Sequence, residues 1–130
     1  MHLQAAIIKE LTSLGYKVKV KAAGESMGRK FAKSSHIILV DGAPAKGKVV
    51  ALLSNGKVLI HRIHRITKDK VVTRGDSSNC YDEPADKRQI LAIADALCRN
   101  GRIQPIKPHH ISSRLLSFAS AAIRAVLLAL

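Results

Sequence analysis

The stretch KVVALLSNGKVLIHRIHRI, residues 48–66, decides the fold of this chain. Residues 48–53 consist of Lys48 and a short apolar run, and residues 57–66 continue with apolar and basic side chains, so both segments predict β-strands. Between them stands Asn55-Gly56, a pair that two-residue hairpin turns favour because both positions need a positive φ angle. The stretch therefore predicts an antiparallel hairpin.

Segments on either side of this hairpin also have strand patterns. Residues 16–20 alternate apolar and basic side chains, and residues 37–40 and 71–73 are short apolar runs. Residues 90–97 suit a helix or a strand, and the short strands before them favour a strand. A turn is expected at residues 99–102, which read Arg-Asn-Gly-Arg.

A helix is expected at each end of the chain. Apolar side chains recur at helical spacing over residues 3–13, and Gly15 is placed to end that helix. After two prolines, the C-terminal stretch predicts an amphipathic helix. The expected fold is mainly β (α+β): one small domain over residues 1–106 with a leading helix, then an apolar and basic helix within residues 107–130.

The charge balance narrows the expected partners. The chain has 22 Lys and Arg against 9 Asp and Glu, a formal net charge of +13, so its surface attracts polyanions such as nucleic acid, anionic lipid or an acidic partner. Only 3% of the residues are aromatic, too few for a surface that stacks bases, and nucleic acid is not expected as a partner. The two cysteines, Cys80 and Cys98, lack the spacing of a metal site, so neither a metal nor a cofactor is expected.

Neither end of the sequence has the pattern of a membrane or export segment. The first apolar run is broken by Lys9 and Glu10, too early for a secretory signal. The C-terminal run over residues 115–130 has 16 residues and contains Arg124, whereas a bilayer span needs about 20 apolar residues. We expect a cytoplasmic or peripheral membrane protein, with residues 112–130 either lying on an anionic membrane surface or packing on protein.

Ser26 is the first residue that could carry chemistry. It lies in Gly24-Glu25-Ser26-Met27, a glycine-containing turn after a strand. A serine hydroxyl is a weak nucleophile until a base removes its proton, and it needs backbone N–H groups nearby to hold an oxyanion. The same pairing of glycine and serine is also common in purely structural turns.

Two histidines, His61 and His64, follow on the strand expected at residues 57–66. Because side chains alternate along a strand, a spacing of three points the two rings to opposite faces. Only one of them can therefore serve a given serine. The alternation assigns each histidine to a face with two apolar neighbours: His61 with Leu59 and Ile63, and His64 with Ile60 and Ile66.

The polar loop after Arg74 contains two carboxylates, Asp76 and Asp82. Such a loop can fold a carboxylate back against an imidazole, which fixes the tautomer of the ring and stabilises its charged form. Loops of this composition also form ordinary Asx turns, so the sequence leaves both interpretations open.

Taken in order, these elements resemble the signal peptidase I family. The resemblance is carried by Gly24-x-Ser26-Met27, a valine-rich strand, His61-Arg62-Ile63 and Arg74-Gly75-Asp76 with Asp82 six residues later. The chain is most similar to the type that uses serine and histidine, found in archaea, in the endoplasmic reticulum and in small bacterial relatives. The self-cleaving SOS-response repressors of the same superfamily have a lysine where His61 stands.

The resemblance implies a role for each candidate. Ser26 would be the nucleophile, His61 the general base, and Asp82 the carboxylate that orients it, with Asp76 supporting the site from the same loop. The repeated His-Arg-Ile leaves His64 as an alternative base. The implied activity is a serine endopeptidase that cleaves leader or signal peptides of a pre-protein after small residues.

The chain departs from the family pattern around the expected substrate groove. Arg29 stands where the family usually has proline, and neither residues 34–36 nor residues 47–48 contain the expected Gly-Asp pair. Two other functions are therefore weighed: an inactive adaptor that binds peptides, and a self-cleaving regulator of the repressor type. Only 25 residues precede Ser26, too few for a DNA-binding domain and a cleavage segment together.

Overall fold

The computed structural model of the chain describes residues 2–21, 24–33 and 36–108. An N-terminal helix, α1 (Leu3–Ser13), precedes a single antiparallel sheet. The remaining elements, in chain order, are β1 (Val18–Val20), α2 (Arg29–Lys33), β2 (His36–Val40), β3 (Val49–Ser54), β4 (Lys57–Ile66), β5 (Lys70–Arg74), β6 (Ala85–Asp86), the 3-10 helix η1 (Lys87–Gln89), β7 (Ile90–Arg99) and β8 (Arg102–Pro105). The expected mainly β (α+β) fold is confirmed.

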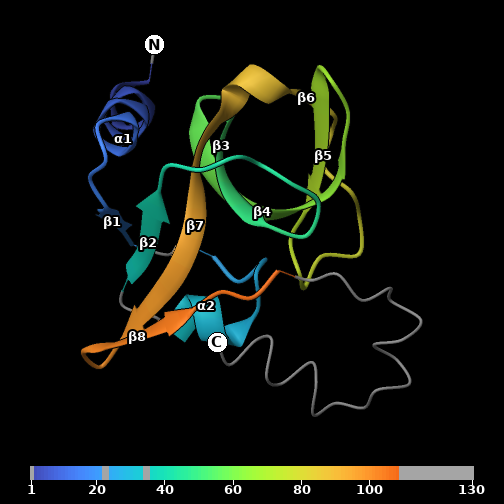
Figure 1. Cartoon of the computed structure of the whole chain (residues 1–130). Coiled ribbons are helices and arrows are strands. Elements are labelled where there is room, and N and C mark those ends of the chain that lie inside the picture. The colour runs from blue at the N-terminus through green and yellow to red at the C-terminus, as the bar shows by residue number, and fades with distance from the viewer. Residues whose placement is uncertain (1, 22–23, 34–35, 109–130) are drawn as a thin grey trace.

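The strands follow the order β1-β2-β7-β3-β4-β5-β6, and β8 pairs with β7 beyond this path. The sheet curls strongly, so that β4, β5 and β6 fold over toward the start of β7 (Figure 1). The long strand β7 pairs with β2, β3 and β8, which ties the two halves of the sheet together. Residues 90–97 thus form a strand, as the sequence favoured.

The hairpin predicted from residues 48–66 is present. Ser54 pairs with Lys57, and the two turn residues, Asn55 and Gly56, have φ angles of 51° and 76°. Two positive φ angles define the type I′ turn, whose twist matches that of the flanking strands. The turn chemistry therefore fixes the register that carries His61 into the sheet opposite Val50.

Both faces of β3, in the middle of the curled sheet, are buried. Neighbouring residues of β3 belong to different apolar clusters: Val49 and Ala51 pack with residues under α1 and α2, while Val50 and Leu52 pack inside the curl. A strand buried on both faces has no polar positions to alternate with apolar ones, which explains the continuous apolar run of residues 49–53.

Four elements were missed by the sequence analysis, and one of them is the three-residue 3-10 helix η1. The polar stretch after Ser26 contains α2, a short helix whose Phe31 is 2% exposed. Residues 77–86 were expected to be loop, but Ala85 pairs with Val71 in the two-residue strand β6. The expected turn at residues 99–102 is the centre of a second hairpin, because Asn100 and Gly101 also have positive φ angles and β8 follows them. None of these segments is long enough to show a periodic pattern.

The expected C-terminal helix lies outside the described residues. Within the part of the chain that the structure describes, no helix combines the length and apolar character needed to cross a bilayer.

Candidate active site

Ser26 lies in a tight turn between β1 and α2. Gly24 and Gly28 both have positive φ angles, and the Gly28 N–H donates to the Glu25 carbonyl at 2.9 Å. Met27 is 4% exposed and packs into the apolar cluster under α1, so it anchors the turn while Ser26 itself stays exposed. In the described part of the chain, no group accepts a hydrogen bond from the Ser26 N–H.

The loop after β5 holds this turn from the other side. The Ser77 N–H donates to the Ser26 carbonyl at 2.8 Å, and the Asp76 N–H contacts the Met27 sulfur at 3.4 Å. A Cβ atom on Gly75 would come within 2.5 Å of the Ser26 carbonyl oxygen. Glycine is therefore required at position 75 if the loop is to approach the Ser26 turn this closely.

His61 lies in the middle of β4 and is 6% exposed. Its Nε2 atom is 2.9 Å from Ser26 Oγ, and its Nδ1 atom is 2.5 Å from Asp82 Oδ2. A carboxylate beside Nδ1 keeps the ring proton on that nitrogen, which leaves the Nε2 lone pair free to accept the serine proton. The three side chains thus form one hydrogen-bonded chain from carboxylate to hydroxyl.

Asp82 is fixed by Thr73, a residue that sequence reasoning missed. The Thr73 hydroxyl donates to Asp82 Oδ2 at 2.7 Å, and the Asp82 N–H donates to the Thr73 carbonyl at 2.9 Å. Thr73 is 1% exposed and pairs with Ile63 across β4 and β5. Nothing in the sequence distinguishes this threonine from an ordinary strand residue, and only the pairing of β4 with β5 brings it to the carboxylate.

Asp76, the other expected carboxylate, does not contact the imidazole. Its two oxygens accept from Nε and Nη2 of Arg62, each at 2.8 Å. Arg62 is 2% exposed, and its Nη1 also donates to the carbonyls of Gly47 and Lys107. Asp76 therefore supports the site indirectly, through an ion pair on the residue next to His61. The sequence analysis assigned no such role to Arg62.

His64 is not brought to Ser26. The pairing of β4 with β5 shifts by one residue between Ile63 and Arg65, and the His64 ring lies edge-on to the Tyr81 ring at 5.5 Å between centroids. The expectation that His64 shares one face with Ile60 and Ile66 is wrong, because these two isoleucines pack into different apolar clusters. A bulge interrupts the alternation on which that expectation rested.

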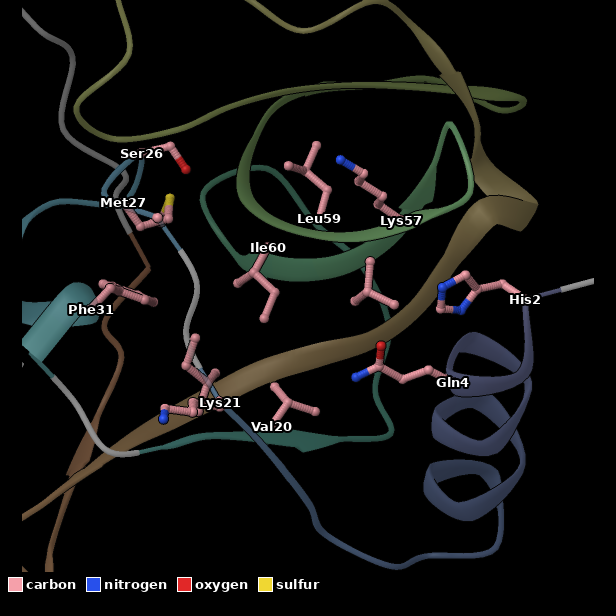
Figure 2. Close-up of a pocket in the computed structure, with 13 residues that line it drawn as sticks. His2, Gln4, Val20, Lys21, Ser26, Met27, Phe31, Lys57, Leu59 and Ile60 are labelled. Atoms are coloured by element: carbon pink, nitrogen blue, oxygen red, sulfur yellow. The ribbon is translucent and has the colours of Figure 1, made fainter.

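A pocket of about 300 Å³ begins at Ser26 and extends away from it toward α1 (Figure 2). Its lining includes Val20 at the end of β1 with the adjacent Lys21, residues 57–60 of β4, and His2 and Gln4 at the start of α1. The reactive hydroxyl is therefore next to a space that a ligand can enter.

The described residues contain no group of three His, Cys, Asp or Glu side chains that could hold a metal ion. The arrangement at Ser26 is instead suited to nucleophilic catalysis, because it combines an accessible hydroxyl, a base and a carboxylate that orients the base. Neither protein-family models nor curated proteins gave a match to this chain.

Proposed function

We propose that this protein is a serine endopeptidase of the signal peptidase I type. The observation that supports the proposal most directly is the chain of contacts from Asp82 through His61 to Ser26. These are the residues to which the sequence resemblance assigns the same three roles. The Ser26–His61 separation of 2.9 Å falls within the hydrogen-bonding range expected of a nucleophile and its base, and the His61–Asp82 contact is shorter still.

In the proposed reaction, Ser26 Oγ bonds to the carbonyl carbon of the scissile peptide while His61 Nε2 takes the hydroxyl proton. The backbone N–H of Ser26, which donates to no group among the described residues, would hold the oxyanion. When the C–N bond breaks, His61 returns the proton to the leaving amine. Water then attacks the acyl group with His61 again acting as base, which releases the carboxylic acid and restores the serine hydroxyl.

The proposed substrates are leader or signal peptides with small residues before the cut. This substrate class follows from the sequence resemblance, and the pocket beside Ser26 provides room for an extended peptide. Arg29 and His36, two described positions where the chain departs from the family pattern, take no part in the Ser26–His61–Asp82 contacts. The departures therefore concern the groove rather than the reacting groups.

The test is cleavage of a peptide library by the purified protein, with products identified by mass spectrometry. We expect cleavage by the native chain and its loss, by a factor of about 10³ or more, in Ser26→Ala. Ser13→Ala, at the end of α1, is the matched control and should cleave normally. Equal cleavage by Ser26→Ala and the native chain would refute the proposal. Peptide binding without cleavage by the native chain would instead favour the adaptor function.

A further inference from the structure

The pocket beside Ser26 runs between two strand edges that have no strand partner among the described residues. The first part of β4, residues 57–60, pairs with β3 on one side, whereas β5 pairs with β4 only from Arg62 onward. On the opposite side of the pocket, β1 pairs only with β2. An extended peptide can therefore lie between these edges and use its backbone groups to pair with them.

The pocket has an apolar part close to the Ser26 turn. Met27, Phe31 and Ile37 line it there, and each is at most 4% exposed. Figure 2 shows Met27 and Phe31 on the same side of the pocket as Ser26, with Ile60 projecting toward its centre. This part offers no charged group to a bound peptide.

The remaining lining has a different chemistry. It contains Lys57 on β4, Lys21 directly after β1, and His2 and Gln4 at the start of α1, and the described lining residues include no aspartate or glutamate. His2 Nδ1 accepts the Ala5 N–H as a helix cap, so the neutral ring carries its proton on Nε2 and can act as a donor. Figure 2 shows the His2 ring pointing from the helix toward the pocket.

Neither Lys21 nor Lys57 forms an ion pair with another described residue. The ion pairs of the described residues involve His61, Arg62 and Arg88, and none of them includes Lys21 or Lys57. Figure 2 shows Lys57 and His2 in the half of the pocket toward α1, whereas Lys21 lies on the Phe31 side. An ammonium group and a ring N–H in that half are donors that fit a negatively charged oxygen.

The position of Lys57 on β4 sets its distance from the reacting atoms. Lys57 and His61 are separated by four positions, so their side chains lie on the same face of the strand. At about 3.3 Å per residue, Lys57 is roughly 13 Å along β4 from His61. A peptide that runs beside β4 in extended form covers that distance in about four residues.

We propose that the end of the pocket remote from Ser26 is a subsite for an acidic side chain of the peptide, about four residues from the scissile bond. The proposal rests on the proposed peptidase function. It adds a second requirement for the substrate, an acidic side chain, to the small residues expected at the cut. Lys57 is its principal determinant, with Lys21 on the opposite side of the pocket and His2 at its end.

The test uses peptides with acetylated and amidated ends, so that only a side chain carries the negative charge. In a series of peptides, a single glutamate is placed in turn at each position from two to six residues from the cut, on either side. Each peptide is compared with a control that has glutamine at the same position. We expect kcat/KM to be about fivefold higher for glutamate than for glutamine at the third to fifth position on one side, the size of one exposed ion pair. The preference should weaken at high salt.

A charge exchange separates recognition from a structural effect. Lys57→Glu should reverse the preference, so that the glutamate peptide becomes worse than its glutamine control and a lysine peptide becomes better. Lys21→Glu should also weaken the preference for glutamate over glutamine, without reversing it. Lys68→Glu makes the same charge change beyond the other end of β4, outside this pocket, and should leave the preference as it is in the native chain.

Binding to the Ser26→Ala variant, measured by fluorescence anisotropy, distinguishes the two proposals. If acidic peptides bind this variant with the Lys57 dependence but the native chain cleaves nothing, the subsite stands and the peptidase function fails. If the native chain cleaves peptides through Ser26 without preferring glutamate to glutamine at any position, the peptidase function stands and the subsite is overturned.

Discussion

Asp76 and Asp82 lie in the same loop and contact adjacent residues of β4, but their surroundings differ. Asp76 is paired in both oxygens with the buried guanidinium of Arg62, whereas Asp82 contacts His61 and the hydroxyl of Thr73. Adjacent residues of a strand point to opposite faces, so the loop supplies a carboxylate to each face of β4. One carboxylate neutralises a charge inside the fold, and the other orients a ring toward the solvent-accessible Ser26.

This comparison teaches that proximity to the reacting groups does not by itself assign a chemical role. Asp76 is near the site in sequence and in space, yet its pairing with Arg62 makes it a structural residue. Removing it should reduce stability, while removing Asp82 should reduce activity. The predictions below test that division from the largest expected effect to the smallest.

The largest effect is expected from Asp82→Asn. The amide can no longer hold the His61 proton on Nδ1, so the ring presents the wrong nitrogen to Ser26. We expect kcat/KM to fall by about 10³- to 10⁴-fold. The free energy of unfolding, measured in urea, should change by about 1 kcal/mol or less. Cleavage within tenfold of the native rate would contradict the assigned role of Asp82.

Asp76→Ala should have the largest effect on stability. It leaves Arg62, which is 2% exposed, with its charge buried and unpaired. Breaking a buried pair in this way costs about 3–5 kcal/mol, which urea unfolding would measure. Asp41→Ala, at an exposed aspartate, is the control and should be close to neutral. A loss of activity as large as that of Asp82→Asn without a loss of stability would contradict the division.

Thr73→Val sharpens the comparison at Asp82 alone. The substitution keeps the shape of the side chain and removes the hydroxyl that donates to Asp82 Oδ2. A hydrogen bond to a charged group is worth about 1.5 kcal/mol or more, so kcat/KM should fall about tenfold. Thr67→Val, in the exposed turn between β4 and β5, is the matched control. An unchanged kcat/KM would show that Asp82 is held without Thr73.

The smallest effect is expected at the exposed pair Asp86–Arg88, which contrasts with the buried pair at Arg62. The side-chain hydrogen bond from Arg88 lowers the pKa of Asp86 from 3.8 to about 2. Any stabilisation from this lowered pKa is present at neutral pH and is lost as the pH falls through about 2. Arg88→Ala should raise the pKa of Asp86, which an NMR titration would measure. The free energy of unfolding at pH 7 should be almost unchanged. If Arg88→Ala lowered the free energy of unfolding as much as Asp76→Ala, burial would not explain the different contributions of the two ion pairs to stability.

Much of the framework could be predicted from local patterns. The Asn55-Gly56 turn fixed the central hairpin because few residue pairs tolerate two positive φ angles. The apolar runs identified β2 and β3, whereas the pattern of residues 90–97 suited a helix or a strand and only the preceding strands favoured β7. The two-residue strand β6 and the five-residue helix α2 could not be predicted in the same way, since both are too short for periodicity and depend on what they pack against.

The amino-acid sequence by itself determined which chemical groups are available: a serine in a glycine turn, two histidines on one strand and two carboxylates in one loop. Only the tertiary structure decided how they pair. Thr73, which pairs with Ile63 across β4 and β5, holds Asp82 against His61, and the buried Arg62 holds Asp76. The physical reason is that side-chain periodicity is a local property of the sequence. The hydrogen bonds at His61 and Arg62 instead join segments that lie apart in the chain and meet only in the folded sheet.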